Sequence, residues 1–334
     1  MLLSVVIPVY NEEAVLPALL VVLRQALDKT DCRYEIVFVN DGSKDATQSI
    51  LAGFCAEDRR VKALNFCRNF GHQMAITAGM DFAGGDAVVV MDADLQDPPG
   101  ILVDMVRLYR QGYDVVSAQR VAREKDTWFK RSTAAFFYWM MRTMVDERLV
   151  PQVGDFRLFS RAAITAIRGF REQHRFMRGL VAWLGLKEAI VPFERQARAA
   201  GSTKYSTLKM IRFAWMAISS FSGLPLRLAL SLGAVLTALG VLYIGYAIHE
   251  AFVHHVVPGW TSLVALQITF SGATLLALGI VGDYIARIYE EIKGRPLYVL
   301  SNALNIDLRA NTVERAVVLD QQGTRDEYWS MTAR

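Results

Sequence analysis

The stretch that decides the fold is Val88-Val89-Val90-Met91-Asp92-Ala93-Asp94-Leu95-Gln96-Asp97-Pro98-Pro99. Its first four residues are apolar, which is typical of a strand buried on both faces of a sheet. The residues that follow end the strand, so we expect Asp92 and Asp94 at the carboxyl end of a core strand, where open α/β sheets bind ligands. Two carboxylates this close repel each other unless a cation lies nearby, and oxygen ligands suit Mg²⁺ or Mn²⁺. The alternative is a solvated acidic turn.

Strands and helices alternate through the first third of the chain. Apolar runs predict strands over residues 2–10, 34–40, 61–65, 87–91 and 114–120. Helical spacing of apolar residues predicts helices over residues 11–28, 46–56 and 71–83. This alternation predicts an α/β fold with a mostly parallel, doubly wound sheet. The ends of three strands, at residues 8–10, 40–41 and 92–94, would then line one edge of the sheet.

Two common nucleotide-binding motifs are missing from the chain. Neither G-x-G-x-x-G nor G-x-x-x-x-G-K-[ST] follows a predicted strand. A bound nucleotide would therefore be held by carboxylates, a metal and basic side chains. Asp41 either accepts hydrogen bonds from a base or ribose or caps the next helix, and Glu12 is most simply a first-turn helix acid. The net charge of +4 does not indicate nucleic-acid binding, and none of the three cysteines has metal-ligand spacing.

The composition changes after residue 220. Hydrophobic residues make up 53% of the chain, and no Lys or Arg occurs between Arg227 and Arg287. Two apolar spans, 228–248 and 263–282, are long enough to cross a bilayer, although two buried helices of a soluble protein are the alternative. Basic flanks predict that both termini are cytosolic and that 249–262 lies outside. We expect a cytosolic domain over 1–226, two membrane helices over 227–285 and a cytosolic tail over 286–334.

Three motifs together resemble family 2 glycosyltransferases with a GT-A fold. They are Ser4-Val5-Val6-Ile7-Pro8-Val9-Tyr10-Asn11-Glu12-Glu13, Val39-Asn40-Asp41-Gly42-Ser43-Lys44-Asp45 and Met91 to Pro99. The resemblance is strongest to the polyprenyl-phosphate branch of that family. It implies metal-dependent, inverting transfer from a nucleotide sugar, with Asp94 and Gln96 at the metal. It also implies nucleotide-sugar binding by a set of residues that comprises Pro8, Tyr10, Glu12, Asp41 and Asp92.

The middle of the chain carries the expected acceptor chemistry. The resemblance assigns Arg120 and Arg131 to a lipid phosphate. It also assigns Asp155 a catalytic role, either as a general base or in positioning the acceptor, while a helix cap is the alternative. The basic stretch around Arg198 and Lys204 is expected to close over the donor diphosphate. Aromatic and basic residues predict surface helices over about 127–146 and 205–222. A core helix is the alternative for the first of them, and a solvated linker is the alternative for the basic stretch around Arg198 and Lys204.

These observations predict an enzyme at the cytoplasmic face of the inner membrane. The expected reaction moves one sugar, from a UDP-sugar by preference, to undecaprenyl phosphate. Transfer of a single sugar is expected over polymerisation because the signature Q-x-x-R-W of processive synthases is absent. The alternatives are transfer to another lipid such as diacylglycerol, and a non-catalytic membrane scaffold that binds sugar nucleotides. The resemblance alone suggests a homo-oligomer, and specifically a tetramer. Membrane lipids are expected partners and nucleic acid is not.

Overall fold

The computed structural model describes residues 1–121, 153–175, 177–194, 224–254, 259–307 and 316–318. The chain divides into two compact units. One comprises Met1–Lys209 with Gly294–Arg334, and the other comprises Met210–Lys293. The predicted surface helices at 127–146 and 205–222 lie outside the described residues, as do Arg131, Arg198 and Lys204.

Within the described residues, nine strands form one sheet in the order β7-β5-β6-β4-β1-β2-β3-β8-β9. The strands are β1 (Leu2–Val9), β2 (Arg33–Asn40), β3 (Val61–Phe66), β4 (Ala87–Val90), β5 (Val115–Arg120), β6 (Val153–Ser160), β7 (Glu188–Phe193), β8 (Tyr298–Leu304) and β9 (Ala316–Val318). β4, β1, β2 and β3 run parallel, whereas β6 and β8 are antiparallel to their neighbours β4 and β3. The predicted mostly parallel, doubly wound sheet is therefore confirmed.

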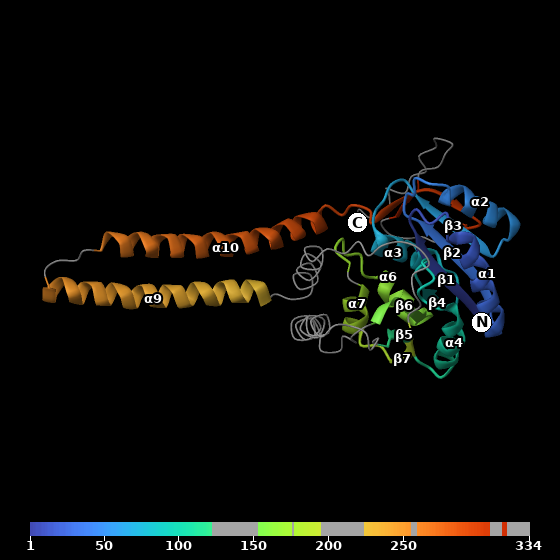
Figure 1. The fold of residues 1–334 in the computed structure, drawn as a ribbon, viewed down its shortest axis with the longest axis horizontal. Coiled ribbons are helices and arrows are strands. Elements are labelled where there is room, and N and C mark those ends of the chain that lie inside the picture. The colour runs from blue at the N-terminus through green and yellow to red at the C-terminus, as the bar shows by residue number, and fades with distance from the viewer. Residues whose placement is uncertain (122–152, 176, 195–223, 255–258, 308–315, 319–334) are drawn as a thin grey trace, which may run out of the picture. The chain divides into compact units, whose positions relative to one another are not determined.

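Helices cover both faces of this sheet (Figure 1). The helices of this unit are α1 (Leu16–Leu27), α2 (Thr47–Glu57), α3 (His72–Phe82), α4 (Leu102–Arg110), α6 (Arg161–Arg168) and α7 (Met177–Leu184). Side chains alternate along each strand, so in β1 Val5 belongs to one buried cluster with residues of α1, α2 and α4, while Val6 belongs to another with residues of α3, α6 and α7. Gly79 lets α3 approach closely, because a Cβ there would lie 2.1 Å from Val6 Cγ1.

The first helix begins later than the sequence suggests. We predicted it from residue 11, but α1 begins at Leu16. The reason is local: Asn11 has a φ of 55°, in the left-handed region, and its side chain accepts a hydrogen bond from the Lys44 backbone. Residues 10–13 therefore form a loop that is tied to the turn after β2.

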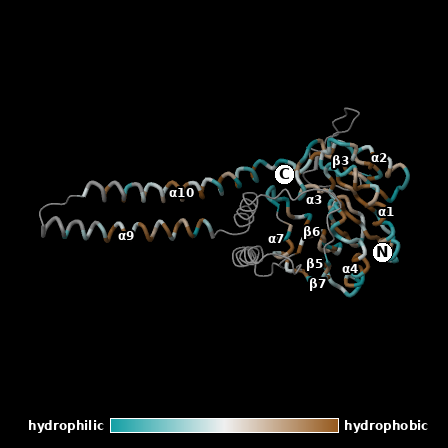
Figure 2. Tube along the Cα trace, viewed as in Figure 1, coloured by the Kyte–Doolittle hydropathy of each residue, from teal (hydrophilic) through white to brown (hydrophobic). Residues whose placement is uncertain are grey.

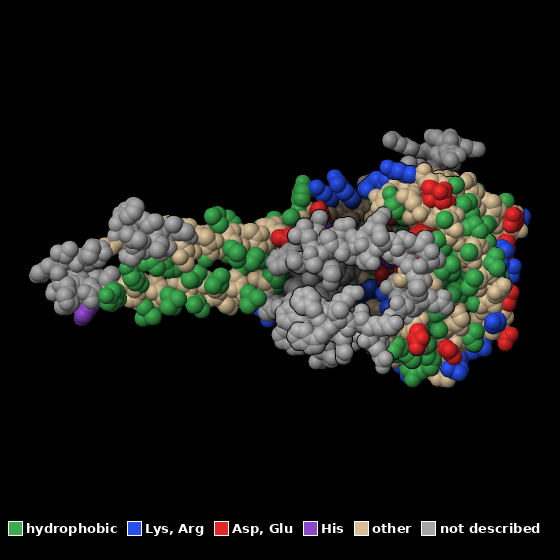
Figure 3. All heavy atoms as spheres, in the orientation of Figure 1, with side chains coloured by type: hydrophobic (Ala, Val, Ile, Leu, Met, Phe, Trp, Pro, Cys, Tyr) green, Lys and Arg blue, Asp and Glu red, His purple; other side chains and the backbone are tan. Residues whose placement is uncertain are grey.

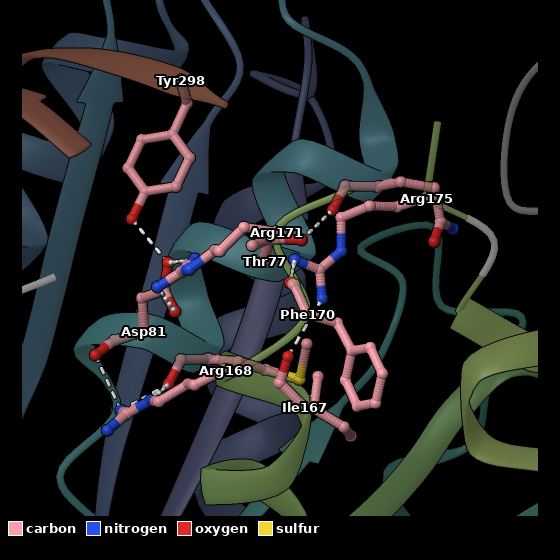
Figure 4. Close-up of polar contacts among 10 residues, drawn as sticks. Thr77, Asp81, Ile167, Arg168, Phe170, Arg171, Arg175 and Tyr298 are labelled. Atoms are coloured by element: carbon pink, nitrogen blue, oxygen red, sulfur yellow. Dashed lines mark hydrogen bonds and ion pairs between the residues drawn. The ribbon is translucent and has the colours of Figure 1, made fainter. Parts of the chain in front are cut away.

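The C-terminal segment contributes to the sheet. Residues 298–304 fall within the predicted tail, yet they form β8 against β3. A buried polar cluster holds the start of this strand (Figure 4): the Tyr298 hydroxyl donates to Asp81 Oδ2 at 2.8 Å, and Arg171 binds both oxygens of Asp81 at 2.8 and 3.1 Å. Asp81 lies near the C-terminal end of α3, where Arg168 donates to two of the last helical carbonyl oxygens, those of Met80 and Asp81. The cluster thus joins β8, α3 and the segment after α6.

The second unit consists of α9 (Leu224–His254) and α10 (Trp260–Ile292). Two stretches are long and apolar enough to cross a membrane, Pro225–Tyr243 and Thr269–Ile292, and neither is buried. Hydrophobic residues occur along both helices (Figure 2), some of their side chains are visible at the surface (Figure 3), and Leu230 and Leu242 are 75% and 70% exposed. Two buried helices of a soluble core would not expose such side chains. The two predicted apolar helices are therefore present, with the second span displaced toward the C-terminus.

Candidate active site

The predicted edge of the sheet is formed by the ends of β1, β2 and β4. Because these strands are parallel, Asp41 after β2 and Asp92 after β4 emerge on the same side. β6 runs the other way and pairs Arg157 with Val90 of β4, so Asp155 lies opposite the residues that follow β4. Asp155 is therefore part of a strand, and the cap of the next helix is Ser160, whose hydroxyl accepts from the Ala163 backbone. The alternative role of Asp155 as a helix cap is wrong.

Three side chains hold the Asp155 carboxylate. Gln73 Nε2 donates to Oδ2 at 3.1 Å, His72 Nε2 lies 3.5 Å from the same oxygen, and Arg178 Nε lies 3.5 Å from Oδ1. Burial alone would raise the pKa of Asp155, but the hydrogen bond to His72 and the positive charge of Arg178 hold that pKa well below its usual range. Asp155 is therefore ionised at neutral pH and held through both of its oxygens.

His72 joins two of the carboxylates. Its Nε2 also lies 3.5 Å from Asp92 Oδ1, and Asp41 contributes to its electrostatic surroundings. Burial lowers the pKa of His72, but the contacts with Asp155 and Asp92 outweigh burial and raise it above the usual value. Burial raises the pKa of Asp92, and the negative charges of Asp155 and Asp94 raise it further. His72 thus bridges Asp92 and Asp155 at this edge.

Sequence reasoning missed His72, Gln73 and the role of Arg178. A single histidine after Gly71 has no spacing that indicates a function. The usable signal was position: residues 71–73 begin a helix that follows a strand of the parallel sheet, so they lie at the same edge as Asp41 and Asp92.

The loop after β4 brings Asp94 and Gln96 together. Leu95 between them has a φ of 57°, an unusual backbone conformation for a leucine. With this turn, the Gln96 backbone N–H donates to Asp94 Oδ1 at 3.1 Å and Gln96 Nε2 donates to Asp94 Oδ2 at 2.8 Å. Such strained residues are concentrated at functional sites.

This pair suits a divalent cation that keeps other ligands. Turning the Gln96 amide about its last bond would present its oxygen beside the Asp94 carboxylate, which makes two hard oxygen ligands. Among the described residues, no group of three or more His, Cys, Asp or Glu side chains could hold a metal ion. Mg²⁺ commonly binds through one or two protein oxygens plus phosphates and water, so the pair is sufficient for a metal bound with a nucleotide diphosphate.

Asp41 lies in a tightly built turn. Its carboxylate accepts the backbone N–H of Phe70 at 2.6 Å and that of Gly71 at 3.0 Å, and burial raises its pKa. The next residue, Gly42, has a φ of 68°, and a Cβ there would lie 2.5 Å from the Arg68 carbonyl carbon. Only glycine fits this position, so the turn is specified by sequence.

The other predicted site residues that the structure describes are Arg120, Pro8, Tyr10 and Glu12. Arg120 Nη2 lies 3.8 Å from Asp97 Oδ1, and the charge of Arg120 acts on Asp92. Pro8 is buried at the end of β1, and Tyr10, just beyond, is 43% exposed. Glu12 donates its backbone N–H to Thr47 Oγ1 at 3.0 Å, within the loop joined to the Asp41 turn.

Comparison with known proteins decides the family. The model of "Glycosyl transferase family 2" matches residues 4–168, and an uncharacterized glycosyltransferase of Bacillus subtilis, YkcC, is 44% identical over 91% of this chain and 94% of its own length. The chain belongs to glycosyl transferase family 2. The SfII prophage-derived bactoprenol glucosyl transferase of Shigella flexneri is 37% identical over 91% of this chain and 98% of its own. This family-2 chain is therefore a glycosyltransferase, and the predicted GT-A fold is confirmed.

Solved structures of other glycosyltransferases resemble the chain more distantly. Glucosyl-3-phosphoglycerate synthase from Mycobacterium tuberculosis, in complex with Mn²⁺, UDP and phosphoglyceric acid, is 16% identical and has a TM-score of 0.44. The similarity covers 65% of this chain and 76% of that one.

Proposed function

We propose that the chain transfers one sugar, with inversion, from a nucleotide diphosphate sugar to the phosphate of a polyprenyl phosphate. The observation that carries the proposal is the meeting of Asp92 and Asp155 at His72, with the charge of Asp94 acting on Asp92, at one edge of the sheet. Relatives named bactoprenol glucosyl transferase, which match about nine tenths of the chain, support a polyprenyl acceptor. We propose a UDP-sugar as the donor, as expected from the sequence.

The donor would occupy the edge between Asp41 and Asp94. Asp41 would accept hydrogen bonds from the base, with Pro8, Tyr10 and Glu12 along the adjoining loop. Asp94 and Gln96 would hold Mg²⁺ or Mn²⁺, which supplies charge neutralisation for the diphosphate leaving group. Asp92 would face the ribose or the sugar, and Arg198 and Lys204 would approach the diphosphate.

Asp155 would position the acceptor or the sugar and would not remove a proton. A general base works best with a pKa near the working pH, whereas the pKa of Asp155 is held far below it by His72 and Arg178. A phosphate acceptor is already ionised near neutral pH, so the reaction needs little base assistance. The fixed carboxylate instead supplies a negative charge close to the position of the anomeric carbon, where positive charge develops during transfer.

The acceptor phosphate would bind at Arg120 and Arg131. Guanidinium groups suit phosphate because they donate two parallel hydrogen bonds. A polyprenyl tail cannot leave the bilayer, which gives a reason for the two apolar helices α9 and α10 in the same chain. We propose that these helices anchor the enzyme in the cytoplasmic membrane with the sheet in the cytosol.

The test is a transfer assay with the full chain in lipid nanodiscs. Radiolabelled UDP-glucose is offered with undecaprenyl phosphate and Mn²⁺, and the expected result is a labelled product that partitions into organic solvent. In Arg120→Ala, the KM for the lipid should rise more than the KM for UDP-glucose. Absence of labelled lipid with UDP-glucose and with a panel of other nucleotide sugars would refute the proposal, as would labelling of diacylglycerol in place of the polyprenyl phosphate.

A further inference from the structure

Three asparagines occupy directly opposed positions on three neighbouring strands. Asn40 of β2 pairs in register with Asn65 of β3, and Asn65 pairs with Asn302 of β8. Asn40 and Asn65 are each 1% exposed. Asparagine is unfavourable in strands, and three in one row at the end of a core sheet need an explanation beyond packing.

Their side chains form a continuous chain of hydrogen bonds. Asn65 Nδ2 donates to Asn302 Oδ1 at 2.6 Å, and Asn40 Nδ2 donates to Asn65 Oδ1 at 2.9 Å. At the other end, the backbone N–H of Ser43 donates to Asn40 Oδ1 at 3.0 Å. Asn40 and Asn65 thus each accept one bond and donate the next in the same direction, and Asn302 accepts the last, an arrangement in which the bonds strengthen one another.

The chain of bonds ends in the turn that carries Asp41. Ser43 is the second residue after Asp41, and its hydroxyl accepts the backbone N–H of Asn11 at 2.9 Å. Asn11 in turn accepts the backbone N–H of Lys44 at 2.9 Å. Ser43 therefore joins the two segments that would hold the donor nucleotide: its hydroxyl binds the loop after β1, and its N–H binds Asn40 at the end of β2.

We propose that Asn302 is a positioning residue for the donor nucleotide, acting through Asn65 and Asn40 on the turn 41–45. This inference rests on the proposed function, since it concerns the donor site of that reaction. Asn302 lies far outside the segment 4–168 that matches the family model, and it follows both apolar helices in the chain. The strand after the membrane helices thereby completes the support of a nucleotide site built by the first half of the chain.

The physical reason is that buried amides must remain hydrogen-bonded. If Asn302 cannot accept, the Asn65 Nδ2 group loses its partner inside the sheet, and the Asn65 amide gains by turning away toward another acceptor. That rotation removes the acceptor of Asn40, which then no longer holds the Ser43 N–H. The turn can shift while the sheet and the strand pairing stay in place.

The test compares three variants of the full chain in nanodiscs. Asn302→Leu has nearly the same size but no acceptor, Asn302→Asp keeps an acceptor oxygen, and Tyr298→Phe is the matched control. Tyr298 is also a buried polar anchor of β8, but its partner Asp81 lies near the end of α3 away from His72. Loss of the Tyr298 hydroxyl should therefore lower stability without changing the turn 41–45.

Binding of UDP and of GDP with Mn²⁺ is measured by calorimetry, and KM and kcat are measured with UDP-glucose and undecaprenyl phosphate. In Asn302→Leu, the nucleotide Kd and the donor KM should rise roughly three- to tenfold, while kcat and the acceptor KM stay unchanged. Asn302→Asp should restore the donor KM to near the wild-type value. Tyr298→Phe should lower the melting temperature and leave the donor KM unchanged.

Unaltered nucleotide affinity in Asn302→Leu would overturn the inference, and so would a rise in donor KM for Tyr298→Phe that equals the rise for Asn302→Leu. The two proposals fail separately. Wild-type protein that binds a nucleotide but transfers no sugar refutes the reaction and leaves the binding comparison as the test of Asn302. Wild-type protein that binds neither nucleotide overturns both.

Discussion

Gly42→Ala should damage the nucleotide turn in a way that can be predicted from its geometry. The φ of 68° disfavours any residue with a Cβ by about 1–2 kcal/mol. The new Cβ would lie 2.5 Å from the Arg68 carbonyl carbon and 2.7 Å from the Asn69 nitrogen, and both are backbone atoms that cannot rotate away. Forcing such an overlap apart costs about 1–3 kcal/mol more.

Together these effects amount to about 2–5 kcal/mol, if the turn stays folded. For a unit of this size, that corresponds to a fall in melting temperature of roughly 4–20 °C, measured by differential scanning fluorimetry. If the turn opens, part of this destabilisation is relieved, and the substitution then weakens nucleotide binding more than it lowers the melting temperature. The two readouts, melting temperature and donor KM, must therefore be recorded on the same preparation.

Gly53→Ala is the matched control for this substitution. Gly53 lies within α2, and a Cβ there would meet nothing within 4 Å, so alanine should raise stability by about 0.5–1 kcal/mol and leave the donor KM unchanged. If Gly42→Ala retains both the wild-type melting temperature and the wild-type donor KM, the argument that glycine is required in the Asp41 turn is wrong.

The remaining predictions concern three other sites. Gln73→Glu would bring a second carboxylate to about 3.1 Å from Asp155 and repel it, so kcat should fall roughly tenfold or more. A wild-type kcat in this variant would refute the proposal that Asp155 must be held in position by Gln73. Asp94→Asn should abolish the stimulation of transfer by Mn²⁺ that EDTA-treated wild-type protein shows, with the circular dichroism spectrum unchanged. Burial and the contact with Asp81 raise the pKa of Tyr298 well above its usual value, so its contribution to stability is complete below about pH 10 and is lost as the pH rises through the raised pKa. Tyr298→Phe should be less stable by about 1–2 kcal/mol at pH 8, and the difference from wild type should shrink at strongly alkaline pH in urea unfolding curves.

The parts of the fold that were predictable are those decided by nearby residues. The strand ending at Asp92 and the turn at Asp41 could be read directly, because apolar runs and helical spacing are local patterns. The predicted start of α1 was wrong because the left-handed backbone at Asn11 depends on the hydrogen bond that Asn11 accepts from the Lys44 backbone, 33 residues away. β8 was missed because its pairing with β3 joins residues 237 positions apart, and nothing near Asn302 in sequence indicates that partner.

The residues of the candidate site could likewise be predicted only where a local motif marks them. Asp92, Asp94 and Asp155 carry recognisable motifs, and the structure brings them to one edge. His72 and Gln73 acquire their roles only when β6 is placed beside β4, since Gln73 lies 82 residues before the Asp155 that it contacts. The sequence left open whether Asp155 acts as a base, because the partners of its two oxygens come from distant segments of the chain.

The position of β8 in the chain has a consequence for biosynthesis. β3 leaves the ribosome early, but the strand that covers its free edge follows α9 and α10. At typical synthesis rates of about 5–20 residues per second, translating from Phe66 at the end of β3 to Leu304 at the end of β8 takes roughly 12–48 s. During that interval the β3 edge is an unpaired template for aggregation. A nascent chain released before this point would have neither a closed sheet nor the Asn302 support, so both apolar helices are translated before the last step of folding.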